Sequence, residues 1–343
     1  MNDADTPSPG DFSDTRAAEL AREAETWDPS SLIPATLDDI PMVDVESYFA
    51  TGNARELERL GEQIRFIGEN IGFHYLVGHG IGQEDFDAIF AAAEAFLTLP
   101  DEVKGRVLID DPEAAAPGIG WMPIGERRLP ERAKGNLNEA ILFKQDRTLR
   151  LSDNPWLPES VVPGFRAAVE AYAARVEQVA LALLPIYAVA LDLDPDWFEP
   201  AFRSPFYRLR MTRYTEVPDA EVDQYGIAPH VDTTFFTLLA QSAQGLAVYG
   251  EQRGVWLEAP VVPEALVVNT GELLKQWSND RFISVKHFVP PHTGERDRYS
   301  VPFFFNATAD YPMECLPSCH GPDNPPRYPP VSYLESQAAA QRE

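Results

Sequence analysis

A histidine and an aspartate separated by one residue, His230 and Asp232, form the most informative local pattern in the sequence. Side chains two residues apart in an extended strand point to the same face, so these two groups can bind one metal ion together. His287 follows 55 residues later (287 − 232 = 55), far enough for a few strands to bring it back beside the pair. Two histidines and one carboxylate are typical of non-haem Fe(II) oxygenases, whereas structural zinc sites favour four ligands. The spacing of His230 and Asp232 is also common by chance, and His287 alone fits an ordinary core or surface histidine.

A second polar pattern lies 11 residues beyond His287 (298 − 287 = 11). Arg298, Ser300 and Phe304 alternate onto one face of a predicted strand, so a guanidinium, a hydroxyl and a phenyl ring would face the cavity that holds the metal. An arginine with a neighbouring hydroxyl is a natural receptor for a carboxylate. The alternative is a structural salt bridge, for which this acidic chain offers many partners.

The elements that must position these residues are short β-rich runs beyond about residue 203. They are separated by turns and cover residues 206–214, 235–241, 246–249, 255–258, 265–269, 284–289 and 299–306. Runs at this spacing predict an antiparallel sandwich or jelly roll. The fold class is therefore mainly β with a helical cap (α+β), around a double-stranded β-helix, or jelly-roll, core.

The preceding part of the chain reads as helices, loops and a few strands. Periodic apolar residues predict helices over 54–71, 83–97 and 159–191, the last with a kink or break at Pro185, and an amphipathic helix over 15–27. Strands are predicted at 40–45, 73–77 and 140–144. Residues 105–157 otherwise read as long loops that could cover the barrel. We therefore expect Phe143, Trp121 and Arg127 there as candidate substrate contacts, although packing or a solvated charge would also account for them.

Composition limits the class of protein. The 343 residues carry a net charge of −26, which disfavours nucleic acid and anionic membrane surfaces as partners. No apolar run is long enough for a membrane span, and the acidic start does not resemble a targeting signal. The two cysteines, Cys315 and Cys319, are too few for a disulfide framework, so we expect a cytoplasmic protein. The predicted regions are a polar leader (1–38), a helical and loop-rich region packing on the core (39–200), a jelly-roll catalytic core (201–310) and a Pro-rich tail (311–343).

Taken together, these segments resemble the isopenicillin N synthase-like family of Fe(II)- and 2-oxoglutarate-dependent oxygenases. The resemblance extends from about residue 40 to 306, and its order and spacing make it specific. Besides the histidine and aspartate pattern, it rests on IPMVD (40–44), GFHYLVGHGI (72–81), GLAV (245–248), VVNTGE (267–272), SVKH (284–287) and RYSVPFFF (298–305).

The resemblance implies that His230, Asp232 and His287 bind iron. It also implies that Arg298 and Ser300 hold the distal carboxylate of 2-oxoglutarate. Family members often carry an Asn-x-Tyr before the iron motif. This chain has Thr212-Arg213-Tyr214, which keeps Tyr214 as a candidate for binding the co-substrate but lacks the asparagine.

The implied activity is O2-dependent oxidation of a small organic molecule by hydroxylation, desaturation or cyclisation, with release of succinate and carbon dioxide. Two alternatives stay open at this point. One is an oxidase of isopenicillin N synthase type that uses no 2-oxoglutarate, and the other is a non-catalytic jelly-roll protein that binds a ligand.

Overall fold

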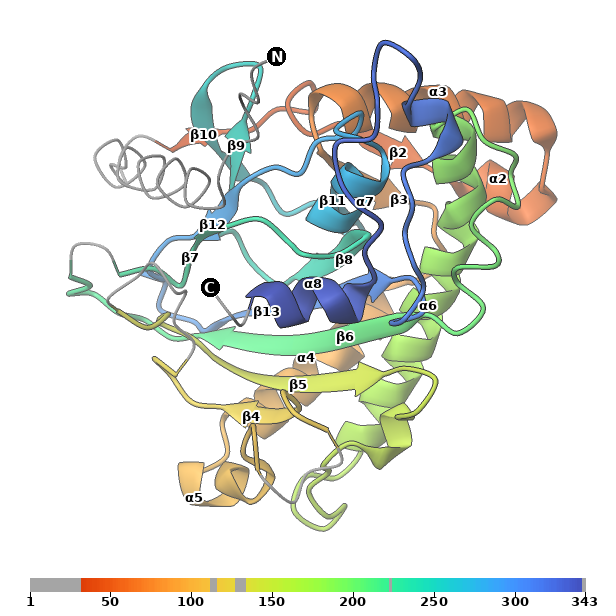
Figure 1. Ribbon diagram of the computed structural model, residues 1–343. Coiled ribbons are helices and arrows are strands. Elements are labelled where there is room, and N and C mark those ends of the chain that lie inside the picture. The colour runs from red at the N-terminus through yellow and green to blue at the C-terminus, as the bar shows by residue number, and fades with distance from the viewer. Residues whose placement is uncertain (1–31, 112–115, 127–133, 222–223, 341–343) are drawn as a thin grey trace, which may run out of the picture.

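Two β-sheets lie face to face and are flanked by helices (Figure 1). The computed structural model describes residues 32–111, 116–126, 134–221 and 224–340. The larger sheet has eight strands in the order β2-β3-β11-β8-β13-β6-β5-β4. These are Met42–Asp44 (β2), Phe73–Val77 (β3), Leu266–Thr270 (β11), Phe236–Gln241 (β8), Arg298–Asn306 (β13), Phe206–Tyr214 (β6), Glu139–Gln145 (β5) and Gly120–Met122 (β4).

The smaller sheet has five strands in the order β1-β10-β9-β12-β7. These are Ile33–Pro34 (β1), Val255–Ala259 (β10), Leu246–Gly250 (β9), His287–Val289 (β12) and Ile227–His230 (β7). Apart from the parallel pairs β1 with β10 and β2 with β3, neighbouring strands in both sheets are antiparallel. The predicted jelly-roll fold is confirmed.

The helices are Glu46–Thr51 (α2), Ala54–Asn70 (α3), Gln83–Leu97 (α4), Asp101–Lys104 (α5), Phe165–Ala190 (α6), Glu272–Trp277 (α7) and Tyr333–Ala340 (α8), with 3-10 turns at Gly105–Val107, Leu151–Asp153 and Pro317–Cys319. Of these, α3, α4 and α6 contact strands of the larger sheet and form a helical layer against it. By length and composition α6 could cross a membrane, but more than half of its most apolar window is buried inside the protein, where it contacts α3 and α4. The helix α6 therefore lies within the helical layer, in contact with both α3 and α4.

The long helix differs from its prediction at two points. It begins at Phe165, because Gly164 adopts a left-handed backbone conformation (φ 74°) directly after Pro163. It also continues through Pro185 without a break. Contacts of α6 with α3 and α4 stabilise the helix, although proline cannot donate the usual backbone hydrogen bond.

The regions predicted from the sequence contribute strands to the same two sheets. Strands β2 to β5, from the part expected to pack on the core, are built into the larger sheet, and β1 joins the smaller one beside β10. The tail returns to the body of the protein, where Leu316 donates its backbone N–H to the carbonyl of Trp277 (2.9 Å) and Tyr333 packs on Phe206. The helix predicted over 15–27 lies outside the described residues.

Candidate active site

The two histidines and the aspartate converge between the two sheets. His230 ends β7 and His287 begins β12, and these two residues are direct partners across the antiparallel pair. Their ring centroids lie 4.4 Å apart. The Nε2 atoms of His230 and His287 lie 3.6 and 3.8 Å from Oδ1 of Asp232, and potential ligand atoms of all three residues lie within 4.8 Å of one another.

Asp232 reaches this point from a loop and not from a strand. The spacing of His230 and Asp232 predicts an extended segment over 230–232, but β7 ends at His230. The loop is held at the start of α7, where the backbone N–H of Glu272 donates to the carbonyl of Asp232 (2.7 Å). Gly271 permits this approach, because a Cβ at that position would overlap the backbone of Thr234.

Hydrogen bonds orient all three potential ligands. The Nδ1 atoms of His230 and His287 lie 2.9 and 3.2 Å from the carbonyl oxygens of Ala228 and Val285. Because a carbonyl oxygen only accepts, each Nδ1 carries a proton, and Nε2 is the ring nitrogen that faces Asp232. Nε2 is therefore the nitrogen through which each ring would bind a metal ion.

The carboxylate of Asp232 is charged although it is buried. Its Oδ2 accepts hydrogen bonds from Thr237 Oγ1 (2.7 Å) and Asn269 Nδ2 (2.9 Å), which leaves Oδ1 facing the histidines. Burial by itself disfavours the charged form, but His287, His230 and these two hydrogen bonds hold the pKa of Asp232 below its ordinary value. Two imidazoles that turn Nε2 toward an ionised carboxylate therefore fit a divalent iron ion that keeps coordination positions open.

A receptor for a carboxylate lies deeper in the same pocket. Arg298 is only 1% exposed, and its Nε and Nη2 donate to Ala243 O (3.0 Å) and Gln241 Oε1 (3.3 Å). Its Nη1 is buried without a hydrogen-bond partner in the described part of the chain. Burial lowers the pKa of Arg298, an effect that Tyr214 partly offsets. A buried guanidinium with one unused nitrogen fits an incoming carboxylate.

Two hydroxyl groups complete this receptor. Tyr214 and Ser300 are hydrogen-bonded to each other (3.3 Å), and the guanidinium of Arg298 lies 4.7 Å from the centroid of the Tyr214 ring. Strand pairing produces this arrangement, because Arg298 lies opposite Tyr214 and Ser300 lies opposite Thr212. The position of the missing asparagine is thus occupied by a buried threonine whose hydroxyl lacks a partner among the described residues.

The metal ligands and the carboxylate receptor line one pocket. Its sixteen lining residues are Phe73, Arg210, Tyr214, Ile227, His230, Asp232, Thr237, Leu239, Leu246, Asn269, His287, Val289, Arg298, Ser300, Pro302 and Phe304. Sequence reasoning assigned no role to Phe73, Arg210, Thr237 or Asn269. Asn269 could have been found from the VVNTGE segment, which is part of the family resemblance. Thr237 shares one face of β8 with Leu239, and both side chains line the pocket.

Of the three candidate substrate contacts that lie in the described part of the chain, Phe304 alone lines this pocket. Phe143 is fully buried on the other face of β5, stacked on Trp156 with ring centroids 4.5 Å apart. Trp121 is also buried, and its Nε1 donates to Glu139 Oε2 (2.9 Å). Neither residue lines the pocket, because alternation along β4 and β5 directs them into packing. Arg127 lies outside the described residues.

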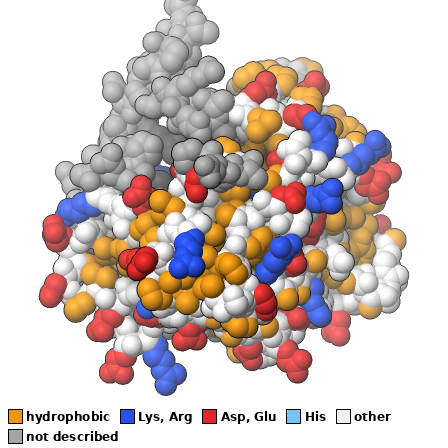
Figure 2. Space-filling view, turned by 90° about the horizontal axis from the view of Figure 1, so that it is seen from below, with side chains coloured by type: hydrophobic (Ala, Val, Ile, Leu, Met, Phe, Trp, Pro, Cys, Tyr) orange, Lys and Arg blue, Asp and Glu red, His pale blue; other side chains and the backbone are white. Residues whose placement is uncertain are grey.

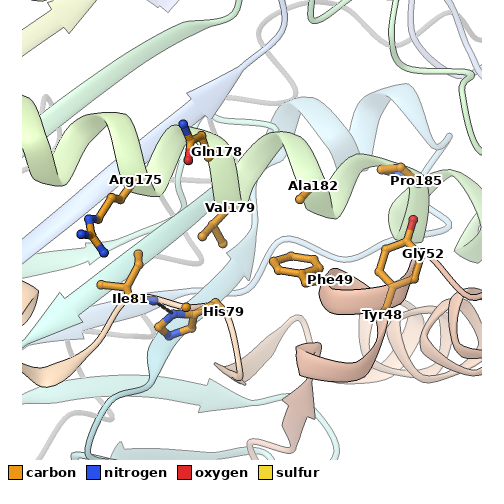
Figure 3. A pocket seen from close by; sticks show the side chains of 11 residues that line it. Tyr48, Phe49, Gly52, His79, Ile81, Arg175, Gln178, Val179, Ala182 and Pro185 are labelled. Carbon is orange, nitrogen blue, oxygen red and sulfur yellow. Dashed lines mark hydrogen bonds between the residues drawn. The ribbon is translucent and has the colours of Figure 1, made fainter.

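A larger hollow between α2, α6 and the turn at residues 79–81 offers less chemistry (Figure 3). Arg175 at its edge is paired with Asp85 (2.9 Å). Burial lowers the pKa of His79, whose Nδ1 accepts from the backbone of Ile81 (3.1 Å). The only group of metal-ligating side chains found in the described residues is the one formed by His230, Asp232 and His287, so the site lies between the sheets.

The fold and this site define a non-haem iron oxygenase with a jelly-roll core. Residues 205–307 match the 2OG-Fe(II) oxygenase superfamily, and residues 40–161 match the N-terminal region of a non-haem dioxygenase in morphine synthesis. The 2-oxoglutarate-Fe(II) type oxidoreductase hxnY of Emericella nidulans is 30% identical over 306 residues, which cover 85% of this chain and 86% of that protein. Azadirone synthase LFS of Melia azedarach is 30% identical and covers 75% and 80% of the two chains.

A solved structure agrees with the fold. It is that of a full-length Neurospora crassa protein in complex with alpha-KG, which superimposes with a TM-score of 0.76 at 24% identity. The superposition covers 92% of this chain and 98% of that chain.

The chain belongs to the 2OG-Fe(II) oxygenase superfamily. It is an Fe(II)- and 2-oxoglutarate-dependent oxygenase that oxidises an organic molecule with release of succinate and carbon dioxide. The two alternatives left open by the sequence, an oxidase that uses no 2-oxoglutarate and a non-catalytic binding protein, are not supported.

Proposed function

We propose that His230, Asp232 and His287 are the iron ligands of this oxygenase. The supporting observation is the convergence of one carboxylate and two correctly oriented imidazoles within 4.8 Å. Thr237 and Asn269 act through Asp232, because their hydrogen bonds fix the carboxylate and keep it ionised. When bound, Fe(II) and 2-oxoglutarate would activate O2, which is the oxidant for breaking a C–H bond of the substrate.

We propose further that Arg298, Ser300 and Tyr214 bind the distal carboxylate of 2-oxoglutarate. The unused Nη1 of Arg298 and the hydroxyl pair can both donate to a ligand in a buried setting, where charge-assisted hydrogen bonds are strongest. One hydroxyl proton is used between Tyr214 and Ser300, so the pair has one proton left for the carboxylate. Anchoring the co-substrate at this end directs its keto-acid end toward the metal ligands. Binding and orienting the co-substrate are thus carried out by β13 and β6.

The substrate we propose is a small organic molecule held beside Phe304, with no nucleic acid or membrane as partner. Lys and Arg side chains are scattered among acidic and apolar ones on the face shown in Figure 2, and the whole chain has a net charge of −26. A cytoplasmic location is part of the proposal. It is supported by Cys315 and Cys319, both of which are free thiols.

An anaerobic titration tests the assigned ligands. Adding Fe(II) and then 2-oxoglutarate to the wild-type protein should produce a visible charge-transfer band. Asp232→Ala should abolish both tight Fe(II) binding and the band while leaving the circular dichroism spectrum near that of the wild type. Unchanged iron affinity in this variant would refute the assignment.

A further inference from the structure

The carboxylate receptor adjoins a side-chain amide, that of Gln241 at the end of β8. The Oε1 atom of this amide accepts a hydrogen bond from Nη2 of Arg298 (3.3 Å). Its Nε2 atom is buried and has no hydrogen-bond partner among the described residues. Because a buried donor without an acceptor costs free energy, folded proteins pair the great majority of such groups. The amide nitrogen of Gln241 therefore requires an explanation.

Arg298 determines which way this amide is oriented. A guanidinium only donates hydrogen bonds, so the amide oxygen of Gln241 must be the atom that contacts it. The opposite orientation would bring N–H groups of the two side chains against each other. The N–H groups of Gln241 are thus the part of the amide that is left for another acceptor.

Strand register places Gln241 beside the receptor. Ser300 is the direct partner of Gln241 on β8 and of Thr212 on β6. Side chains of directly paired residues lie on the same face of a sheet, and Ser300 lines the active-site pocket. Leu239, two residues before Gln241 on β8, also lines this pocket. Gln241 therefore lies on the pocket side of β8, at the end where Arg298 and Ser300 meet.

Buried polar atoms that lack a partner in the described part of the chain gather around Ser300. They are Nη1 of Arg298, Nε2 of Gln241 and Oγ1 of Thr212. These atoms belong to three adjacent strands, β13, β8 and β6, and each of them can donate a hydrogen bond. Several unpaired donors around one residue indicate a ligand that accepts hydrogen bonds.

A carboxylate has the capacity to accept from an additional donor. Its two oxygens together accept about four hydrogen bonds. Nη1 of Arg298 and the one free proton of the Tyr214–Ser300 hydroxyl pair do not use this capacity fully. A neutral amide N–H next to them supplies a further hydrogen bond to a charged acceptor, which is stronger than one between neutral groups.

We infer that Gln241 is a further co-substrate-binding residue, which donates from Nε2 to the distal carboxylate of 2-oxoglutarate while its Oε1 holds Arg298. This inference rests on the proposed function of the site. A direct hydrogen bond implies that Gln241 contributes to 2-oxoglutarate affinity even when the guanidinium of Arg298 is removed.

Calorimetric titration of the anaerobic Fe(II) protein with 2-oxoglutarate tests the inference. Gln241→Leu should weaken binding about tenfold or more, as expected for the loss of a hydrogen bond to a charged acceptor. Gln145→Leu is the matched control, because Gln145 on β5 bonds instead with Leu151 and Glu177 and does not line the pocket. It should leave 2-oxoglutarate affinity unchanged.

A double variant separates direct binding from an effect through Arg298. In the Arg298→Met background, Gln241→Leu should weaken 2-oxoglutarate binding by a further factor of about three or more. If Gln241 acted only by holding the guanidinium, the double variant would bind as Arg298→Met does. A double variant that binds too weakly to measure, beside a measurable Arg298→Met, counts as a further loss.

Nuclear magnetic resonance gives a readout that does not depend on affinity. The wild-type protein is labelled with [15N]glutamine and loaded with Zn(II), which is diamagnetic, in place of Fe(II). The side-chain amide proton of Gln241, assigned by its absence from Gln241→Leu, should move downfield when 2-oxoglutarate is added. This measurement decides the matter if Arg298→Met forms no measurable complex. Should Gln241→Leu fail to fold by circular dichroism, Gln241→Met replaces it throughout.

Three results would each overturn the inference. They are unchanged 2-oxoglutarate affinity in Gln241→Leu, a double variant that binds no more weakly than Arg298→Met, and an amide proton of Gln241 that does not move on addition of 2-oxoglutarate. Any of them would leave the receptor formed by Arg298 standing, provided that Arg298→Met itself weakens binding. A wild-type protein that forms no complex with 2-oxoglutarate would instead refute the proposed function, so the two failures are distinguishable.

Discussion

Replacing Arg298 by methionine should separate co-substrate binding from folding. The substitution keeps a long side chain but removes the buried guanidinium whose Nη1 is left over for a ligand. A hydrogen bond to a charged group contributes about 1.5–3 kcal/mol. At about 1.4 kcal/mol for each factor of ten, Arg298→Met should weaken 2-oxoglutarate binding by about 10- to 100-fold.

The same substitution should have little effect on the stability of the protein without ligands. It removes hydrogen bonds to Ala243 and Gln241, which costs free energy, but it also removes a cation that burial disfavours. Replacing a buried charge by an apolar side chain is often neutral or stabilising, so the free energy of unfolding should change by no more than about 1 kcal/mol.

Calorimetric titration of the anaerobic Fe(II) protein with 2-oxoglutarate measures the first effect, and denaturant unfolding measures the second. Arg213→Met is the control on the neighbouring strand, because Arg213 pairs with Asp297 (2.6 Å) and Glu139 (3.0 Å) outside the pocket. It should destabilise the protein by about 1–3 kcal/mol and leave 2-oxoglutarate affinity unchanged. If Arg298→Met alters affinity less than Arg213→Met does, the assignment of the carboxylate receptor is wrong.

Three further predictions concern single side chains. Asn269→Ala removes a hydrogen bond that holds Asp232 and should weaken Fe(II) binding by about 10- to 100-fold in a metal titration, and unchanged affinity would show that the amide is dispensable. Ser300→Ala removes one neutral hydroxyl and should weaken 2-oxoglutarate binding by only about 2- to 10-fold, so a loss as large as that of an arginine variant would contradict its assigned role. Phe143→Ala should lower the free energy of unfolding by about 3–5 kcal/mol, because its ring is fully buried against Trp156, and should not affect co-substrate binding.

Local pattern was sufficient to predict several elements. The period of apolar residues predicted α3 and α4 almost to their ends, since an amphipathic helix carries its burial pattern in its own sequence. Alternation on β13 likewise predicted that Arg298, Ser300 and Phe304 share one face, and all three line the pocket.

Which residues meet across the sheets depends on the three-dimensional arrangement. The chain's residue types and spacing identified the two histidines, the aspartate and the arginine as candidates, because the order and spacing of these residue types match those of the family that the sequence resembles. They could not show that Asp232 leaves β7 on a loop held by α7, or that Thr237 and Asn269 fix its carboxylate. Nor could they show which face of β5 is directed into the helical layer. Those features depend on the register between strands far apart in the chain, which is set by packing of the whole core.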